Sequence, residues 1–341
     1  EGAPFVGNTK VLTEHDNILE LASSYQFASD DPSITLSTPR ALLGKIDEIQ
    51  VSVADFGAVG DGSTDNVTAF ETAFTELFRN VNENYQKVLY VPNGEYNFLS
   101  DLEIPSNTII RGETQSKAIL KLDTNNIRFI TSDGSGLINF DSSNRPENIE
   151  ISNLTIQRSS GQTVITGLKN SKFVDVVWQG EYVLGNTVSS LATEPAAVFW
   201  NNTVTGFKVN EIVFDSCKFN SNSVSIKCAQ TIVTDTKVAI KNSKFFVNDT
   251  SIYITGVADQ TNAWNIIDND FEEIATQVFY STNGFGTKIQ NCNFKSCGNG
   301  TGNSSSPTSS IITFGQSRNN TVLNCITDRQ QDAAVVTSEL I

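Results

Sequence analysis

Asp270 and Glu272 are two carboxylates separated by one residue in a short β-rich run, Ile266–Glu272. Alternate residues of a strand face the same side, and two positions along a strand lie about 7 Å apart. That spacing falls within the roughly 6.5–9.5 Å between the acid and the base of an inverting glycoside hydrolase. We therefore predict Asp270 and Glu272 as a catalytic pair, with Glu273 and Asp249 as alternatives.

A structural interpretation competes with catalysis. Lys244 and Lys295 occupy the matching positions of neighbouring runs, so Asp270 and Glu272 also fit a surface charge ladder. Ion pairs of that kind contribute little individually to stability.

Aromatic residues supply the natural platform for a sugar. Trp178, Tyr182 and Trp200 lie in or beside an irregular stretch at about 175–205, where a loop leaving a rigid scaffold can form a groove wall. We predict these three residues as substrate-binding. The alternative is that they pack the loop onto the scaffold.

Charge and composition narrow the ligand classes. A net charge of -15 argues against nucleic acid, whose binders need clustered Lys and Arg, and disfavours a strongly anionic ligand. The acidic group from Asp268 to Glu273 lacks the glycine and the spacing of a twelve-residue calcium loop. We expect no metal or other cofactor. The apolar runs are shorter than the roughly 20 residues that a membrane span requires, so no membrane insertion is expected.

An internal repeat defines the scaffold that carries these residues. Each copy has an apolar residue at position zero, a polar turn residue at +2 and a second core residue at +5. Seven segments fit: Ile151-Asn153-Ile156, Leu168-Asn170-Phe173, Phe214-Ser216-Phe219, Ile240-Asn242-Phe245, Ile266-Asp268-Phe271, Ile289-Asn291-Phe294 and Val322-Asn324-Thr327. Asn tolerates left-handed backbone geometry better than other non-glycine residues, so +2 is read as a sharp bend between two strands.

Stacking such copies at about 4.8 Å would align the bend residues in a ladder and the Phe residues in an aromatic column. The repeat therefore predicts an all-β fold, a right-handed parallel β-helix with regular coils at about 148–330. A β-sandwich is the alternative, but it predicts hairpin turns and no column identity.

The N-terminal part reads differently. Residues 1–50 contain two stretches at helical spacing, after Thr13 and Thr38, and are interpreted as an attachment segment and helical linker. Residues 51–341 form the predicted β-helix domain, within a chain that we expect to continue beyond residue 341. It opens with a short strand at 51–57, an amphipathic helix at about 64–83 that caps the solenoid, and a hairpin-like signal across Asn93-Gly94.

Three stretches resemble the pectate-lyase-like β-helix family: Val51–Asn66, Val88–Tyr96 and Ile109–Thr114. The resemblance extends to about residue 330 and is specific for fold, not for reaction. The family includes phage tailspikes and tail appendages, polygalacturonases and β-1,3-glucanases. The Gly-His-Gly motif of the polygalacturonases is missing, since the single histidine is His15, and the His and Arg motifs of the calcium-dependent pectate lyases are absent too.

The layout of 1–50 followed by a β-helix is similar to that of tailspikes. The resemblance implies a homotrimeric virion tail protein that recognises, and in an enzymatic version depolymerises, host surface polysaccharide such as O-antigen or capsule. It also implies contact with other virion tail proteins through the N-terminal segment. Two alternatives stay open: a non-catalytic tail stalk or adaptor, and a secreted β-helix glycoside hydrolase.

Overall fold

The computed structural model describes residues 5–6, 9–10, 51–78, 86–131, 145–202 without 185, 187 and 189, 210–230, 236–255, 262–282, 286–298, 311–315, 319–328 and 337–338. The chain divides into two compact units, Glu1–Gln50 and Val51–Ile341. In the first unit the described residues form two antiparallel strands, β1 (Phe5–Val6) and β2 (Thr9–Lys10). The helices predicted within residues 1–50 lie outside the described residues, so the attachment segment stays a prediction.

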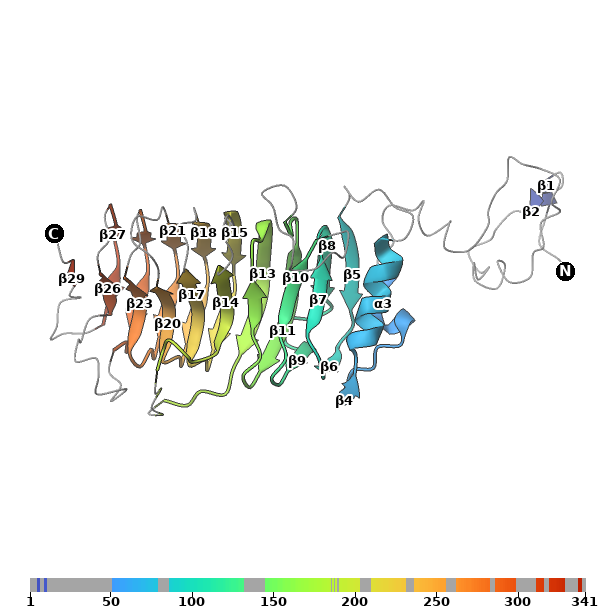
Figure 1. The fold of residues 1–341 in the computed structure, drawn as a ribbon, viewed down its shortest axis with the longest axis horizontal. Coiled ribbons are helices and arrows are strands. Elements are labelled where there is room, and N and C mark those ends of the chain that lie inside the picture. Colours follow the sequence, from blue (N-terminus) through green and yellow to red (C-terminus); the bar gives the residue numbers. More distant parts are fainter. Residues whose placement is uncertain are drawn as a thin grey trace. The chain divides into compact units, whose positions relative to one another are not determined.

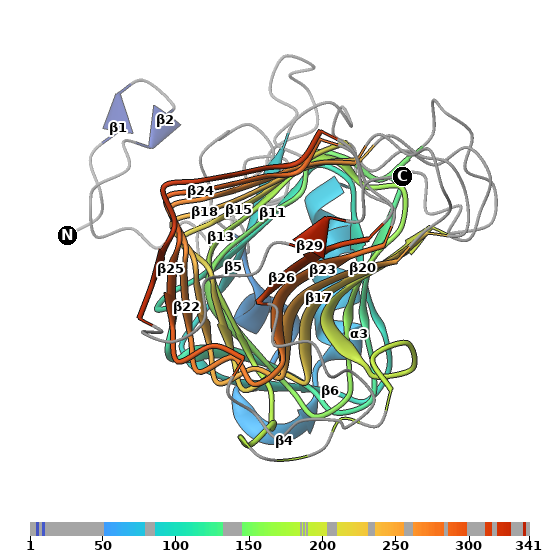
Figure 2. The same ribbon diagram turned by 90° about the vertical axis from the view of Figure 1, so that its left-hand side faces the viewer.

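The second unit is a stack of coils (Figure 1). Each regular coil contributes one strand to each of three faces, here called A, B and C (Figure 2). Every described strand pairing in this unit is parallel, which confirms the predicted all-β parallel β-helix. Face A holds β3 (Val51–Ser52), β5 (Lys87–Val91), β8 (Thr108–Gly112), β15 (Asn210–Asp215), β18 (Thr236–Lys241), β21 (Asn262–Ile267), β24 (Lys288–Gln290) and β27 (Thr321–Leu323).

Face B holds β4 (Asp61–Asp65), β6 (Gly94–Phe98), β9 (Ala118–Leu122), β16 (Lys218–Asn220), β19 (Lys244–Phe246), β22 (Asp270–Glu272), β25 (Asn293–Lys295) and β28 (Ile326–Thr327). Two long strands, β11 (Glu150–Arg158) and β13 (Lys169–Gln179), run from face A through the bend to face B. Face C is a nine-stranded sheet of β7 (Leu102–Pro105), β10 (Ile127–Ile130), β12 (Thr163–Ile165), β14 (Ala196–Asn202), β17 (Val224–Gln230), β20 (Thr250–Thr255), β23 (Gln277–Ser281), β26 (Ile312–Phe314) and β29 (Thr337–Ser338).

Helix α3 (Val67–Phe78) covers the N-terminal end of the stack, where Figure 1 shows it beside β5. Its buried residues are Val67, Phe70, Ala73, Phe74 and Leu77, which follow the spacing of one helical face. Phe70 packs edge-on against Phe98 with ring centroids 5.0 Å apart. The predicted cap is therefore present, and its described helix is shorter than the expected 64–83.

Two local predictions at this end are wrong. The expected strand at 51–57 is β3 followed by a 3-10 helix, η1 (Val53–Phe56), because Ser52 and Asp55 form a reciprocal capping box. The expected hairpin around Asn93-Gly94 is a bend between faces: β5 pairs with β3 and β8, whereas β6 pairs with β4 and β9. Glycine suits this corner because a Cβ on residue 94 would lie only 2.8 Å from the Cα of Gly60.

The bend between faces A and B carries the predicted ladder. Asn153, Ser216, Asn242, Asp268, Asn291 and Asn324 all have φ between +51° and +57°. The Nδ2 of Asn291 donates to Oδ1 of the bend residue Asp268 at 3.0 Å. Strand pairing aligns the coils of Ser216, Asn242 and Asp268 in the same way, and Asn242 donates to Asp215, the residue before the preceding bend, at 3.0 Å. The bend residues of successive coils therefore lie above one another, as the repeat predicted.

The predicted register of the second copy of the repeat, Leu168-Asn170-Phe173, is wrong. Strand pairing puts Phe173, not Leu168, beside Ile151 and Phe214 at position zero. Asp175 then occupies the bend with φ +53°, and Trp178 takes position +5. Asn170 also has positive φ, but it belongs to another corner, next to Asn148.

From Trp178 to Phe294 the +5 positions form one aromatic column through the core. Centroid distances are 4.6 Å for Trp178–Phe219, 4.6 Å for Phe219–Phe245, 4.7 Å for Phe245–Phe271 and 5.4 Å for Phe271–Phe294. The rings lie within 24° of parallel. This spacing matches the distance between neighbouring strands, so the column fixes the register of the coils.

Buried asparagine side chains form hydrogen bonds with the backbone at the corners. Asn269 accepts from the Ser243 amide at 2.8 Å and donates to the Ile240 carbonyl at 2.9 Å. At the corner after face B, Asn248 repeats this pattern by accepting from the Asn222 amide and donating to the Phe219 carbonyl. Each side chain thus satisfies backbone groups of the preceding coil that the strand ladders leave unpaired.

Replacing Asn269 by alanine should destabilise the fold by about 3 kcal/mol, because one buried N–H and one buried C=O lose their partners. Asn293→Ala is the matched control: Asn293 is exposed and donates to Asp270, so its loss should stay within about 0.5 kcal/mol. Urea denaturation of both variants measures the difference. Equal shifts would contradict the role given to the buried amide.

Candidate functional site

The predicted catalytic pair lies on β22, on face B. Asp270 is exposed and accepts from Asn293 Nδ2 at 2.8 Å. Glu272 accepts from Lys244 Nζ at 2.7 Å and also pairs with Lys295. Hydrogen bonds from Lys244, then from Lys295, lower the pKa of Glu272 to about 2. Two lysines favour the ionised form of Glu272, and these surroundings favour the charge-ladder interpretation. Catalysis by the pair stays a prediction.

The prediction that Trp178 and Trp200 form a sugar platform is wrong, because both indoles are 0% exposed. Trp178 belongs to the aromatic column, where its Nε1 donates to Thr163 Oγ1 at 3.2 Å. Trp200 faces inward from β14 and packs against Trp264 with centroids 5.3 Å apart. Both residues follow the alternative, packing in the core.

The other three predicted site residues, Glu273, Asp249 and Tyr182, do not all lie together. Glu273 occupies a corner after β22 with φ +56°. Asp249 is 3% exposed and lies at a corner before face C. Tyr182 is nearly buried, and its hydroxyl donates to Asp249 Oδ1 at 3.4 Å. The structure therefore brings Tyr182 and Asp249 together, away from the aromatic column.

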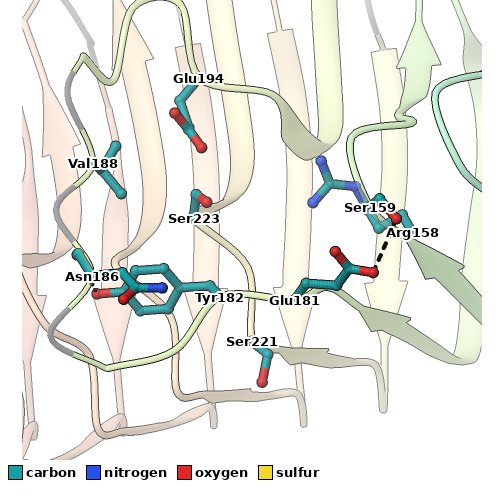
Figure 3. A pocket seen from close by; sticks show the side chains of 9 residues that line it. All are labelled: Arg158, Ser159, Glu181, Tyr182, Asn186, Val188, Glu194, Ser221 and Ser223. Atoms are coloured by element: carbon teal, nitrogen blue, oxygen red, sulfur yellow. Dashed lines mark hydrogen bonds between the residues drawn. The ribbon is translucent and has the colours of Figure 1, made fainter.

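Tyr182 belongs to an excursion, the residues between the end of β13 at Gln179 and the start of β14 at Ala196. The excursion and the adjacent β-helix together line a pocket of about 260 Å³ (Figure 3). We call it the Arg158 pocket; its lining residues are Arg158, Ser159, Glu181, Tyr182, Asn186, Val188, Glu194, Ser221 and Ser223. The excursion lies within the irregular stretch predicted at about 175–205, whereas Arg158, Glu181 and Glu194 were not predicted because they belong to no repeating pattern.

Two cations hold the excursion against the β-helix. Arg158 donates to the Gly161 carbonyl, to Asn222 Oδ1 at 3.1 Å and to the Pro195 carbonyl at 3.3 Å. Lys227 donates from β17 to the carbonyls of Ala192 and Glu194. The pocket wall is thus tied to β11 and β17 through main-chain oxygens.

Apolar contacts complete the attachment. Tyr182, Val188 and Ala275 form a small buried cluster separate from the main core, and Leu191 packs against it. Because a loop positioned by a rigid scaffold is a common place for a binding site, this attachment makes the pocket a candidate for function.

The electrostatics of the pocket centre on Arg158, which is 4% exposed. Burial lowers the pKa of Arg158 to about 10, and the nearby carboxylates of Glu194 and Glu181 oppose that shift. Within the described part of the chain, no carboxylate lies within ion-pair distance of this guanidinium. Figure 3 shows Arg158 and Glu181 on one side of the pocket and Tyr182 and Asn186 on the other.

The arrangement offers both kinds of hydrogen-bonding group. A guanidinium has five N–H donors, of which three have the partners given above. Glu181 accepts from Ser159 Oγ at 3.0 Å and is otherwise exposed, and Glu194 adds a second carboxylate acceptor. A ligand with several hydroxyl groups, each both donor and acceptor, fits this lining. The described residues contain no group of three or more His, Cys, Asp or Glu side chains arranged to hold a metal.

The parallel β-helix with a pocket on an excursion defines a pectate-lyase-like protein. The chain belongs to the family described as "Rhamnogalacturonase A/epimerase, pectate lyase-like", whose model matches residues 50–327. The family resemblance predicted from the sequence is therefore confirmed.

Sequence comparison relates the chain to phage tail appendages. It is 35% identical over 115 residues to the pre-neck appendage protein of Bacillus phage B103 and 33% identical over 117 residues to that of Bacillus phage phi29. Each match covers 33% of this chain and only 12% of the appendage protein. A solved structure titled "Geobacillus virus E2 - ORF18" aligns with a TM-score of 0.44 at 15% identity, covering 95% of this chain and 67% of that one. No helix among the described residues is long and apolar enough to cross a membrane.

Asp249 provides a pH test of this site. Burial raises its pKa above the ordinary value of 3.8, Glu194 adds to that effect, and hydrogen bonds from Thr250 and Tyr182 oppose it. A raised pKa in the folded state means that ionisation of Asp249 opposes folding, so the contribution of Asp249 to stability should fall as the pH rises above about 4.

Asp249→Asn removes this cost. Its free energy of unfolding should match the wild type at pH 3.5 and exceed it at pH 7, as measured by urea denaturation across that range. Asp270→Asn, at an exposed carboxylate on face B, is the control substitution. A parallel pH profile for Asp249→Asn and wild type would show that burial does not raise the pKa of Asp249.

Proposed function

We propose that this chain is the β-helix domain of a phage tail appendage and that it binds host surface polysaccharide through the Arg158 pocket. The relation to pre-neck appendage proteins supports the virion tail assignment. Contact with other tail proteins through residues 1–50 and assembly as a homotrimer belong to the same proposal.

The observation that carries the binding proposal is the composition of the pocket. Arg158 supplies buried N–H donors, Glu181 and Glu194 supply carboxylate acceptors, and Tyr182 supplies an aromatic wall. Convergent polar groups of this kind fix the orientation of a small ligand in a pocket. The non-catalytic stalk or adaptor, in contrast, requires no such lining and predicts that no glycan binds.

Hydrolysis at the same pocket is a second candidate, favoured by the presence of two carboxylates in one lining. Glycoside hydrolases use a pair of Asp or Glu residues on either side of the scissile bond. Glu181 and Glu194 come from opposite ends of the excursion, so a sugar held by Arg158 would lie between two acids. The same two carboxylates would also serve a secreted β-helix glycoside hydrolase, the alternative left open by the sequence.

Glu181→Gln and Glu194→Gln should each weaken glycan binding about tenfold, because a charged hydrogen bond becomes a neutral one. Binding of the full chain is measured by calorimetry against dextran, laminarin, galactomannan, polygalacturonate and hyaluronate. Asp270→Asn is the control, since it neutralises an exposed carboxylate on face B. If wild type binds no glycan, or if both pocket variants bind like wild type, the pocket proposal is wrong.

A reducing-end assay separates the two candidate catalytic sites. On any glycan that the protein cleaves, Glu194→Gln should lower the rate at least about 100-fold, the typical effect of losing a general acid or base. Asp270→Asn and Glu272→Gln should retain the wild-type rate. The reverse outcome would place the chemistry at the pair on face B, and binding without any release of reducing ends would limit the function to recognition.

A further inference from the structure

Two cysteines from neighbouring coils, Cys292 and Cys325, lie at the same position of the corner between faces A and B. Strand β24 pairs with β27 before this corner, and β25 pairs with β28 after it. Two backbone hydrogen bonds join the coils on either side of the pair. The Asn291 amide donates to the Leu323 carbonyl at 3.0 Å. The Ile326 amide donates to the Cys292 carbonyl at 2.9 Å, so the two cysteines are held in register.

Earlier coils show how far a side chain at this corner position reaches. Ser243 Oγ accepts from the amide of Cys217, the equivalent residue of the coil before, at 3.1 Å. Asn269 Oδ1 accepts from the Ser243 amide in the same way, at 2.8 Å. Each side chain thus touches the equivalent residue one coil earlier. At the next pair of thiols this places the Cys325 side chain against Cys292, and the two side chains are hydrogen-bonded.

The spacing of the two residues fits a disulfide. Neighbouring strands lie about 4.8 Å apart, and the Cα atoms of disulfide-bonded cysteines lie about 4.4–6.8 Å apart. The Cβ atoms of a disulfide lie about 3.8 Å apart, so the corner of Cys325 would move toward Cys292 by roughly 1 Å. The described pairings hold β27 and β28 only through β24 and β25, which leaves this coil free to make that movement.

The two thiols differ in reactivity. Cys292 is 0% exposed, whereas Cys325 is intermediate in exposure. A hydrogen bond from the Cys292 side chain lowers the pKa of Cys325 to about 6, and the hydrogen bond to Cys325 together with burial raises the pKa of Cys292. Reactive cysteines combine partial exposure with a lowered pKa. Cys325 is therefore suited to react first with an oxidant, and Cys292 is placed to react second.

The coil of Cys325 is weakly buried. Val322, at the core position of this coil, is only intermediate in exposure. Leu323 and Ile326, on either side of the corner, are 46% and 68% exposed. Each coil of a solenoid is stabilised by contact with its neighbours, so a coil with little buried surface opens more readily than the rest. A covalent link to the preceding coil would oppose that opening.

We infer that Cys292 and Cys325 are a site of oxidative modification, at which a disulfide ties the coil of β27 and β28 to the coil of β24 and β25. The oxidant is a small-molecule disulfide. Thiols stay reduced in the cytosol and oxidise outside cells, so the chain folds as a dithiol and the link forms in an oxidising environment. The inference goes beyond the proposed function and does not depend on glycan binding.

The reaction is a thiol–disulfide exchange in two steps. The Cys325 thiol first loses its proton to solvent, and its thiolate attacks one sulfur of the small disulfide, which breaks that bond and releases one small thiolate. The Cys292 thiol then attacks Cys325 Sγ, forms the protein disulfide and releases the second small thiol. The first small thiolate takes up a proton from solvent. Two protein thiols are thus oxidised while one small disulfide is reduced to two thiols.

The test exposes the full reduced chain to oxidised glutathione. The intact mass of the wild type should fall by two hydrogen atoms, and peptide mapping without reductant should recover Cys292 linked to Cys325. Hydrogen exchange of the Ile326 amide, which bonds to the Cys292 carbonyl, should slow about tenfold, because the link restrains opening of the coil. Dithiothreitol should reverse both changes.

Cys217→Ser is the matched control. Cys217 occupies the same corner position three coils before Cys292, is 1% exposed, and has a pKa that burial raises to about 12. This variant should form the link and slow the exchange of Ile326 as the wild type does. Cys325→Ser should show the same exchange rate with and without oxidant. Cys292→Ser should keep a mixed disulfide of glutathione on Cys325, because the second thiol is missing.

The wild type alone can overturn the inference. Folded wild-type protein that gains no link between Cys292 and Cys325, or that links Cys325 to a second copy of the chain, shows that the pair is not a disulfide site. A link that forms without slower exchange at Ile326 overturns the restraint of the coil. Circular dichroism checks that each variant is folded, and because no glycan is present, these results leave the proposed function untouched.

Discussion

The structure depends on one constraint: each coil completes its backbone hydrogen bonds only through the coil above and the coil below. A parallel pair has to be in register for these bonds to form, so a residue type suited to one coil is suited to the same position of the next. Asn269 and Asn248 enforce that rule at the corners by bonding to the backbone of the preceding coil. The aromatic column enforces it inside, because rings stacked at the strand spacing tolerate little sliding.

The same constraint explains what the sequence could and could not predict about the fold. A bend residue with positive φ every coil leaves a visible asparagine pattern, and a stacked core leaves a phenylalanine pattern, so the solenoid was predictable. The register of one coil was not, because Leu168-Asn170-Phe173 and Phe173-Asp175-Trp178 fit the same template. The second fit uses Trp in place of Phe and Asp in place of Asn. Assigning Trp178 to the core requires the pairing partners Ile156 and Phe219, which only the folded chain supplies.

The residues of the candidate site were harder to predict than the fold. The repeat identifies residues at regular positions, whereas the pocket residues lie where the repeat is interrupted. Asp270 and Glu272 attract attention through their regular position, yet that regularity is what places lysines of neighbouring coils against Glu272. Glu181 and Glu194 lie where the repeat is interrupted, and no periodicity marks them. The available signal was the long, irregular interval between the coil of Phe173 and that of Phe214, which located the excursion but not its chemistry. Arg158 gave no signal at all, since it ends a strand and becomes buried only when the excursion folds over it.

The way in which the excursion is held bears on its suitability as a binding wall. Arg158 and Lys227 are buried cations whose described hydrogen bonds go to carbonyl and amide oxygens, and both bond to the main chain of the excursion. Burying a cation in this manner opposes folding unless its donors find acceptors, and burial lowers the pKa of both groups accordingly. An apolar side chain at either position would often give equal or greater stability than a buried cation. Retaining two cations there preorganises the pocket, and a preorganised site binds more tightly because less motion is lost when the ligand arrives.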